Sequence, residues 1–141
     1  MTILAILTAD WHLSHRPPIA RSVEPNWYKA MRRPLDEIWH LAQDGIPLVV
    51  AGDVFDTWNE PAELTNFAIS ALKNYRYVVA VPGQHDLPNH RLAEITRSCY
   101  WTLFNSGHIG RIHLRKEPFA FGLVHPLNLH GFPWGRSVKP L

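Results

Sequence analysis

The stretch Ile46–Asp56 reads IPLVVAGDVFD and contains the pattern that decides the fold. Its first part, Ile46–Ala51, is an aliphatic run typical of a buried strand. Its second part is the polar string GDVFD at positions 52–56, which begins where the strand ends. In parallel α/β sheets, ligands bind beyond the carboxyl ends of the strands, so this string is a candidate binding segment.

The same order of strand and polar cluster occurs on both sides of this stretch. Ile3–Thr8 is an aliphatic run that we expect to be a strand buried on both faces, and Asp10 and His12 follow it. Tyr75–Val81 is a further apolar run, and the string GQHD at positions 83–86 follows it. Three strands are therefore each followed by polar side chains.

Helical segments separate the three strands. Apolar residues at helical spacing predict a helix that begins either at Trp27 or at Pro34 and ends near residues 44–45. A second helix is predicted over Pro61–Lys73. Strands that alternate with helices predict a mostly parallel sheet, and the carboxyl ends of its strands share one edge. The sequence thus predicts an α/β protein in which the three polar clusters converge.

The remainder of the chain has a different pattern. After a short helix predicted over Leu92–Trp101, the segments 108–114, 119–124 and 127–132 have period-two or short apolar character. They are expected to be successive strands of a second sheet. The whole chain, residues 1–141, is interpreted as a single domain.

Composition limits the functional classes only weakly. The chain has 141 residues, of which 46% are hydrophobic and 18% charged, as in globular proteins, and its net charge of +2 is too small to indicate a polyanionic partner. The only cysteine, Cys99, cannot form an intramolecular disulfide. The apolar segment Met1–Leu7 lacks the basic flank of a signal peptide and is too short to span a membrane, so we expect a cytoplasmic protein without membrane contact.

The residue types in the three clusters indicate a metal site. If the backbone is extended at Asp10 and His12, both side chains point to the same side and can bind one cation. Asp53 adds a carboxylate, and Gln84 and His85 add an amide oxygen and an imidazole. Each cluster alone is common by chance, but three of them at equivalent positions after strands are strong evidence for shared chemistry.

In order and spacing, these clusters resemble the motifs of the calcineurin-like metallophosphoesterases, which run Asp-x-His, Gly-Asp-x-x-Asp and Gly-Asn-His-Asp or Glu. The strings GDVFDT at 52–57 and GQHDLPNH at 83–90 are most similar to SbcD-type DNA exonuclease subunits, particularly phage-borne ones. The resemblance covers nearly the whole chain. It implies a two-sheet αβ sandwich flanked by helices, with two divalent metal ions, usually manganese.

The resemblance also implies roles for the residues that match the motifs. Asp10 and His12 would bind the first metal ion, Asp53 would bridge both ions, and Gln84 would bind the second. Two cations about 3.5 to 4 Å apart can lower the pKa of a shared water and hold the phosphoryl oxygens during in-line attack. His85 would be the acid near the leaving group.

Four further side chains have roles with alternatives. Asp56 would orient the imidazole of His85, or would only cap its loop. Gln84 replaces the asparagine that is commoner in the family, and its extra methylene predicts a weaker second site or a water between the amide and the metal. His90 could face the substrate, and Arg21 could contact a phosphate backbone, although arginines on loops are usually solvated charges.

The family completes its site with a later histidine and a Gly-His-x-His motif, and the sequence of 141 residues contains neither. His125 is interpreted as a loop residue and His130 as a structural one. We therefore expect the N-terminal part of the domain, truncated before the C-terminal histidine motifs, with weak metal binding and little activity.

Three functions remain open at this stage. The leading hypothesis is a metal-dependent phosphodiesterase that hydrolyses DNA, as an SbcD-like exonuclease, with an SbcC-type coiled-coil ATPase as partner and a homodimer as a further expectation. A phosphatase or small-molecule phosphodiesterase would use the same motifs. An inactive fragment that binds metal or a partner is the third alternative.

Overall fold

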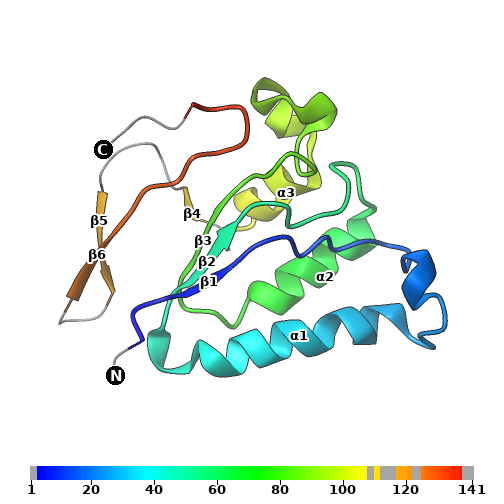
Figure 1. Cartoon of the computed structure of the whole chain (residues 1–141), viewed down its shortest axis with the longest axis horizontal. Helices are drawn as coiled ribbons and strands as arrows, with labels where there is room; N and C mark the ends of the chain where they lie inside the picture. Colours follow the sequence, from blue (N-terminus) through cyan, green and yellow to red (C-terminus); the bar gives the residue numbers. More distant parts are fainter. Residues whose placement is uncertain (1–2, 108–109, 112–116, 122–124, 138–141) are drawn as a thin grey trace.

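The structure is a computed structural model that describes residues 3–107, 110–111, 117–121 and 125–137 (Figure 1). The strands are β1 (Ile6–Thr8), β2 (Leu48–Ala51), β3 (Val78–Val81), β4 (Gly110–Arg111), β5 (Glu117–Phe121) and β6 (His125–Leu129). The helices are α1 (Trp27–Leu41), α2 (Ala62–Leu72) and α3 (Cys99–Asn105). Short 3-10 helices are η1 (Ile19–Arg21), η2 (Gln43–Gly45), η3 (Pro88–His90) and η4 (Leu92–Arg97).

The first four strands form one parallel sheet in the order β1-β2-β3-β4. Because all four strands run in the same direction, their carboxyl ends lie at the same edge of the sheet. The predicted α/β class with a parallel sheet and flanking helices is therefore confirmed. None of the described helices is long and apolar enough to cross a membrane.

The helices cover one face of this sheet and form the main core with it. Ile6, Leu48 and Val78 are aligned across β1, β2 and β3 and face the helices. The helices contribute Met31, Leu35, Leu64, Ala68, Leu72 and Leu103 to the same cluster. Figure 1 shows α1 and α2 side by side along the strands. Burial of this apolar area is the main force that holds the three polar clusters in place.

The first strand differs from its prediction. It is shorter than Ile3–Thr8, and Leu7 is 72% exposed, whereas Val49 and Val79 on the same face are buried. The prediction that this strand is buried on both faces was therefore wrong. β1 lies at the edge of the described sheet and pairs there with β2, whereas β2 and β3 are each flanked by two strands.

The first helix begins at Trp27 and continues through Pro34, so the alternative start at Pro34 is excluded. Asn26 precedes it in an extended conformation, and its side chain accepts a hydrogen bond from the backbone N–H of Lys29 at 2.9 Å. This N-cap satisfies a backbone donor that has no partner within the helix, which explains why the helix begins seven residues before the proline.

The segment predicted as one helix over Leu92–Trp101 is two helices, η4 and α3. Ser98 separates them in an extended conformation, and its side chain accepts a hydrogen bond from the backbone N–H of Trp101 at 3.1 Å. A serine that caps a new helix ends the preceding one, so periodicity alone could not reveal this break.

The C-terminal strands divide between two sheets. β4 pairs in parallel with β3 and belongs to the first sheet, so the prediction that the segment 108–114 begins the second sheet was wrong for residues 110 and 111, and its other residues lie outside the described part. β5 and β6 form a separate antiparallel pair, in which His125 lies opposite Phe121. The loop interpretation of His125 was also wrong. An alternating pattern predicts a strand but does not show which sheet the strand joins.

Candidate metal centre

The loops that follow β1, β2 and β3 meet at the carboxyl edge of the parallel sheet, as predicted. The backbone N–H of Asp10 donates to the carbonyl of Gly52 at 3.1 Å, and that of His12 donates to the carbonyl of Asp53 at 3.1 Å. The side-chain carboxylate of Asp53 accepts from the backbone N–H of His85 at 2.9 Å. The first loop is thus bound to the second, and the second to the third.

Asp10, His12 and Asp53 form one candidate ligand group. Their ligand atoms all lie within 4.8 Å of one another, and His12 Nε2 is 3.9 Å from Asp10 Oδ1. Two carboxylates and an imidazole are ligands that divalent first-row cations accept, so the donor set fits a metal ion. Solvent reaches the group, since the side chains of Asp10 and His12 are 72% and 37% exposed.

All three residues of this group have left-handed backbone conformations, with φ of 54° at Asp10, 44° at His12 and 51° at Asp53. The backbone at Asp10 and His12 is therefore not extended, which was the condition for their side chains to point to the same side, although their ligand atoms still meet. Such conformations are uncommon for residues other than glycine, and strained backbone is concentrated at functional sites. Their coincidence with the ligand group supports a binding role.

A second carboxylate orients the imidazole of the group. His12 Nδ1 lies 3.1 Å from Asp56 Oδ1, an arrangement that places the ring proton on Nδ1 and leaves Nε2 free on the side of Asp10. The atoms of His12, Asp56 and His85 also lie within 4.8 Å of one another. Because Nδ1 of His12 is engaged by Asp56, we interpret this second group as support for the first rather than as another cation site.

The imidazole of His85 is held by the backbone of the second loop. Its Nδ1 donates to the carbonyl oxygen of Asp56 at 3.0 Å, and its ring meets that of His12 edge-on, with centroids 4.9 Å apart. The carboxylate of Asp56, which was predicted to orient His85, instead contacts His12. The prediction placed the correct residue beside His85 but assigned the interaction to the wrong atoms.

Gln84 and His90 lie next to His85. The side-chain nitrogen of Gln84 is 3.3 Å from His85 Nε2, and the backbone carbonyl of Gln84 accepts from His90 Nδ1 at 2.9 Å. The ring centroids of His85 and His90 are 6.3 Å apart. The structure therefore places His90 beside the proposed acid, while metal ligation by Gln84 and substrate contact by His90 remain predictions.

The other candidates lie away from these groups or have local partners. Arg21 belongs to η1, where its guanidinium pairs with Glu24 at 2.8 Å and stacks over the ring of Trp27. Its contact with a phosphate backbone remains a prediction. His130 is half-buried and belongs to neither ligand group.

Sequence reasoning gave no role to Asp86, which is the most buried charged side chain near the site. It is 0% exposed, and its carboxylate accepts from the backbone N–H groups of Val54, Phe55 and Gly83 at 3.2, 2.9 and 2.9 Å. Burial raises the pKa of Asp86 to about 6, although the three donors favour its ionised form. The available signal was the acidic residue at the end of the string GQHD.

Two glycines allow the second and third loops to approach each other. A Cβ atom at Gly83 would collide with the side chain and backbone nitrogen of Asp53, and one at Gly52 would lie 3.0 Å from the Cα of Gly83. Gly52 also has φ of 97°, which favours glycine. The glycines of both motifs are therefore required by contact between the loops.

A parallel α/β sheet with carboxylate and imidazole ligands at its carboxyl edge defines a candidate metal-dependent hydrolase. The family model of the calcineurin-like phosphoesterases matches residues 3–134, and the chain belongs to this family. The protein is accordingly a phosphoester hydrolase of a family that binds divalent metal ions. No curated protein matches the chain.

Replacement of Asp86 by asparagine tests the role of the buried carboxylate. The asparagine NH2 group cannot accept, so at least one backbone N–H, such as that of Phe55, would lose its acceptor. We expect the free energy of unfolding, measured by urea denaturation, to fall by about 1 to 3 kcal/mol. In contrast, Asp36→Asn removes an exposed carboxylate that is paired with Arg32. This variant should change the free energy of unfolding by less than about 1 kcal/mol. Equal effects of the two variants would contradict this role.

Proposed function

We propose that this protein is a metal-dependent nuclease that hydrolyses DNA phosphodiesters. The observation that carries the proposal is the ligand group of Asp10, His12 and Asp53, with the imidazole of His85 next to it. The choice of DNA is supported by the similarity of the strings at 52–57 and 83–90 to SbcD-type exonuclease subunits. Manganese is the proposed metal, because it accepts both carboxylate and imidazole ligands.

Each residue of the proposed site has a separate task. Asp10, His12 and Asp53 would hold a cation, and Asp56 contacts Nδ1 of His12 so that Nε2 would be available as its ligand atom. When bound, divalent ions supply Lewis-acid stabilisation of the phosphoryl oxygens and lower the pKa of a water. The loops after β1 and β2 would thus bind the cation and orient the imidazole of His12.

His85 is the proposed general acid. Its Nδ1 donates to the carbonyl of Asp56, so the atom that can hold a transferable proton is Nε2. In its protonated form, Nε2–H needs an acceptor before the leaving oxygen arrives, and the Gln84 amide can present its oxygen by turning over. Gln84 therefore lies where its amide can contact the proton-bearing atom of the proposed acid.

The other expectations for the family remain proposals. An SbcC-type ATPase would be the partner, and a homodimer the assembly. Histidine motifs beyond Leu141 would complete the two-metal site. A phosphatase or small-molecule phosphodiesterase uses the same ligand residues, and an inactive metal-binding or partner-binding fragment is the alternative that needs no turnover.

The first test measures hydrolysis. A form of the protein that includes the histidine motifs predicted after Leu141 is expected to degrade linear DNA in the presence of manganese, while the 141-residue chain shows little or no activity. p-Nitrophenyl phosphate serves as the comparison substrate for the phosphatase alternative. Absence of manganese-dependent DNA degradation by the longer form would contradict the nuclease proposal.

The second test measures metal binding by calorimetry with manganese on the 141-residue chain. We expect weak binding that is lowered further in Asp53→Asn, because the described ligand group offers one cation only three side chains. Glu63→Gln, which removes an exposed carboxylate on α2, is the control and should leave the binding unchanged. Two tight manganese sites in this chain would contradict the expectation.

The third test separates the acid from the ligands. In the form that hydrolyses DNA, His85→Ala should leave manganese affinity unchanged and lower the rate of hydrolysis by roughly 100-fold to 10,000-fold, the usual contribution of a general acid. A parallel loss of manganese affinity would show that His85 is a ligand instead.

A further inference from the structure

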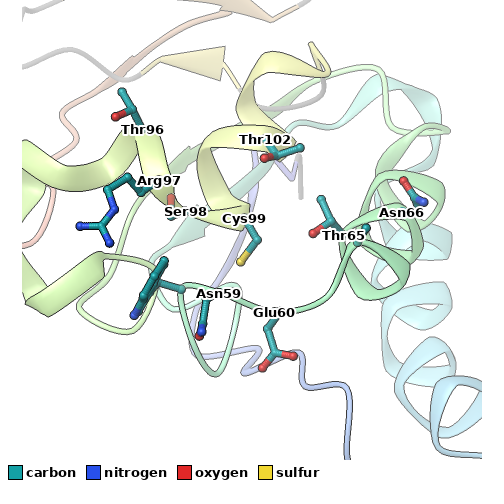
Figure 2. A pocket seen from close by; sticks show the side chains of 11 residues that line it. Asn59, Glu60, Thr65, Asn66, Thr96, Arg97, Ser98, Cys99 and Thr102 are labelled. Atoms are coloured by element: carbon teal, nitrogen blue, oxygen red, sulfur yellow. The ribbon is translucent and has the colours of Figure 1, made fainter.

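A pocket outside the metal loops has no role in the proposed hydrolysis. It has a volume of about 400 Å³ and lies between the loop after the string GDVFD, the first half of α2, and the junction of η4 and α3. Its lining includes Trp58, Asn59, Asn66, Thr96, Arg97 and Thr102. Figure 2 shows Asn59 on the loop and Asn66 on α2, with Cys99 and Thr102 extending from α3. A volume of this size is within the range of small-molecule sites.

The charged groups of the pocket already have partners. The guanidinium of Arg97 pairs with Glu94 at 2.7 Å and lies over the ring of Trp58, 5.4 Å from its centroid. The carboxylate of Glu60 accepts from the hydroxyl of Thr57 at 3.0 Å. The guanidinium of Arg97 is therefore already paired, which disfavours a charge-assisted bond to a phosphate in this pocket.

The uncharged polar groups, in contrast, are available. Within the described residues, the side chains of Asn59, Asn66, Thr96 and Thr102 form no hydrogen bond. Amides and hydroxyls both donate and accept. Trp58 adds an aromatic ring, and because the guanidinium of Arg97 lies over one face, a flat group would have to stack on the other face. Neutral donors and acceptors beside an indole fit a nucleobase, whereas a lipid chain would require an apolar lining.

The pocket is joined to the metal loops by a short, fixed segment. Trp58 follows Asp56 by two residues, so their Cα atoms are at most about 7 Å apart. The carbonyl of Trp58 accepts from the backbone N–H of Cys99 at 2.8 Å, and the Cys99 thiol lies 3.5 Å from the carbonyl of Thr57. Asp56 at the metal loops and Trp58 in the lining of the pocket therefore belong to one short loop segment.

We propose that this pocket binds a nucleobase of the DNA strand whose phosphodiester lies at the metal loops. The proposal rests on the proposed nuclease function, because that function brings the strand to Asp56. The pocket contributes affinity and position through stacking on Trp58 and hydrogen bonds to Asn59 and Asn66. Cleavage itself depends on the metal ligands and His85.

The test measures binding without catalysis. A fluorescent single-stranded hexanucleotide is titrated against the 141-residue chain in EDTA, and binding is followed by anisotropy. Thr102→Trp fills the pocket from an exposed position, and Asn59→Ala with Asn66→Ala removes two hydrogen-bonding groups. Each variant should raise Kd about tenfold. Asn105→Ala, at the exposed end of α3 outside the pocket, is the matched control and should leave Kd unchanged.

A hexanucleotide with 5-bromodeoxyuridine locates the base directly, because light crosslinks the base to nearby aromatic side chains. Mass spectrometry should find the crosslink at Trp58, and its loss in Thr102→Trp would support the pocket. Crosslinks only elsewhere, together with unchanged Kd in all pocket variants, would overturn the proposal. Failure of the nuclease proposal would give a different result. The longer form would then leave DNA intact in the presence of manganese, and this outcome does not depend on where the hexanucleotide binds.

Discussion

Three backbone N–H groups from two loops donate to one buried carboxylate, that of Asp86. These bonds fix the loop after β2 against the loop after β3, and Asp53 adds a further bond to the backbone of His85. Gly83 is required because any side chain there would occupy the place of Asp53. A carboxylate removed from water is stable only with such donors, so the second and third loops hold their relative position as a unit.

The proposed chemistry depends on that unit through a chain of oriented groups. Asp56 holds the ring of His12 with its carboxylate and the ring of His85 with its carbonyl, so one residue positions both a proposed ligand and the proposed acid. The proposed ligands have left-handed backbones, a cost that the surrounding hydrogen bonds and core packing offset. Preorganisation of this kind is what a cation site needs, because the ligands need not reorganise when the ion binds. The same loop continues to Trp58, which connects the metal loops with the proposed nucleobase pocket.

Much of the fold could be predicted because it depends on local periodicity. The first three parallel strands and the helices α1 and α2 follow from apolar runs and helical spacing, and their ends were misplaced by only a few residues. The predictions failed where the answer depended on contacts distant in sequence. Leu7 is exposed on β1, which lies at the edge of the described sheet, and β4 joins the first sheet although its pattern resembles that of the strands that follow it. Ser98 divides a predicted helix because its hydroxyl oxygen accepts a hydrogen bond from the backbone N–H of Trp101 and so caps the start of α3.

By itself, the sequence determined the order of strands and polar clusters, and hence that Asp10, His12 and Asp53 would meet at one edge, because parallel strands bring their carboxyl ends together. Only the tertiary structure decided which atoms pair there. Asp56 contacts His12 across 44 residues, and Asp86 reaches Val54 across 32, and such contacts follow from the exact placement of loops rather than from any spacing. The proposed nucleobase pocket belongs to the same class, since its lining comes from a loop and the three helices α2, η4 and α3, which only packing brings together.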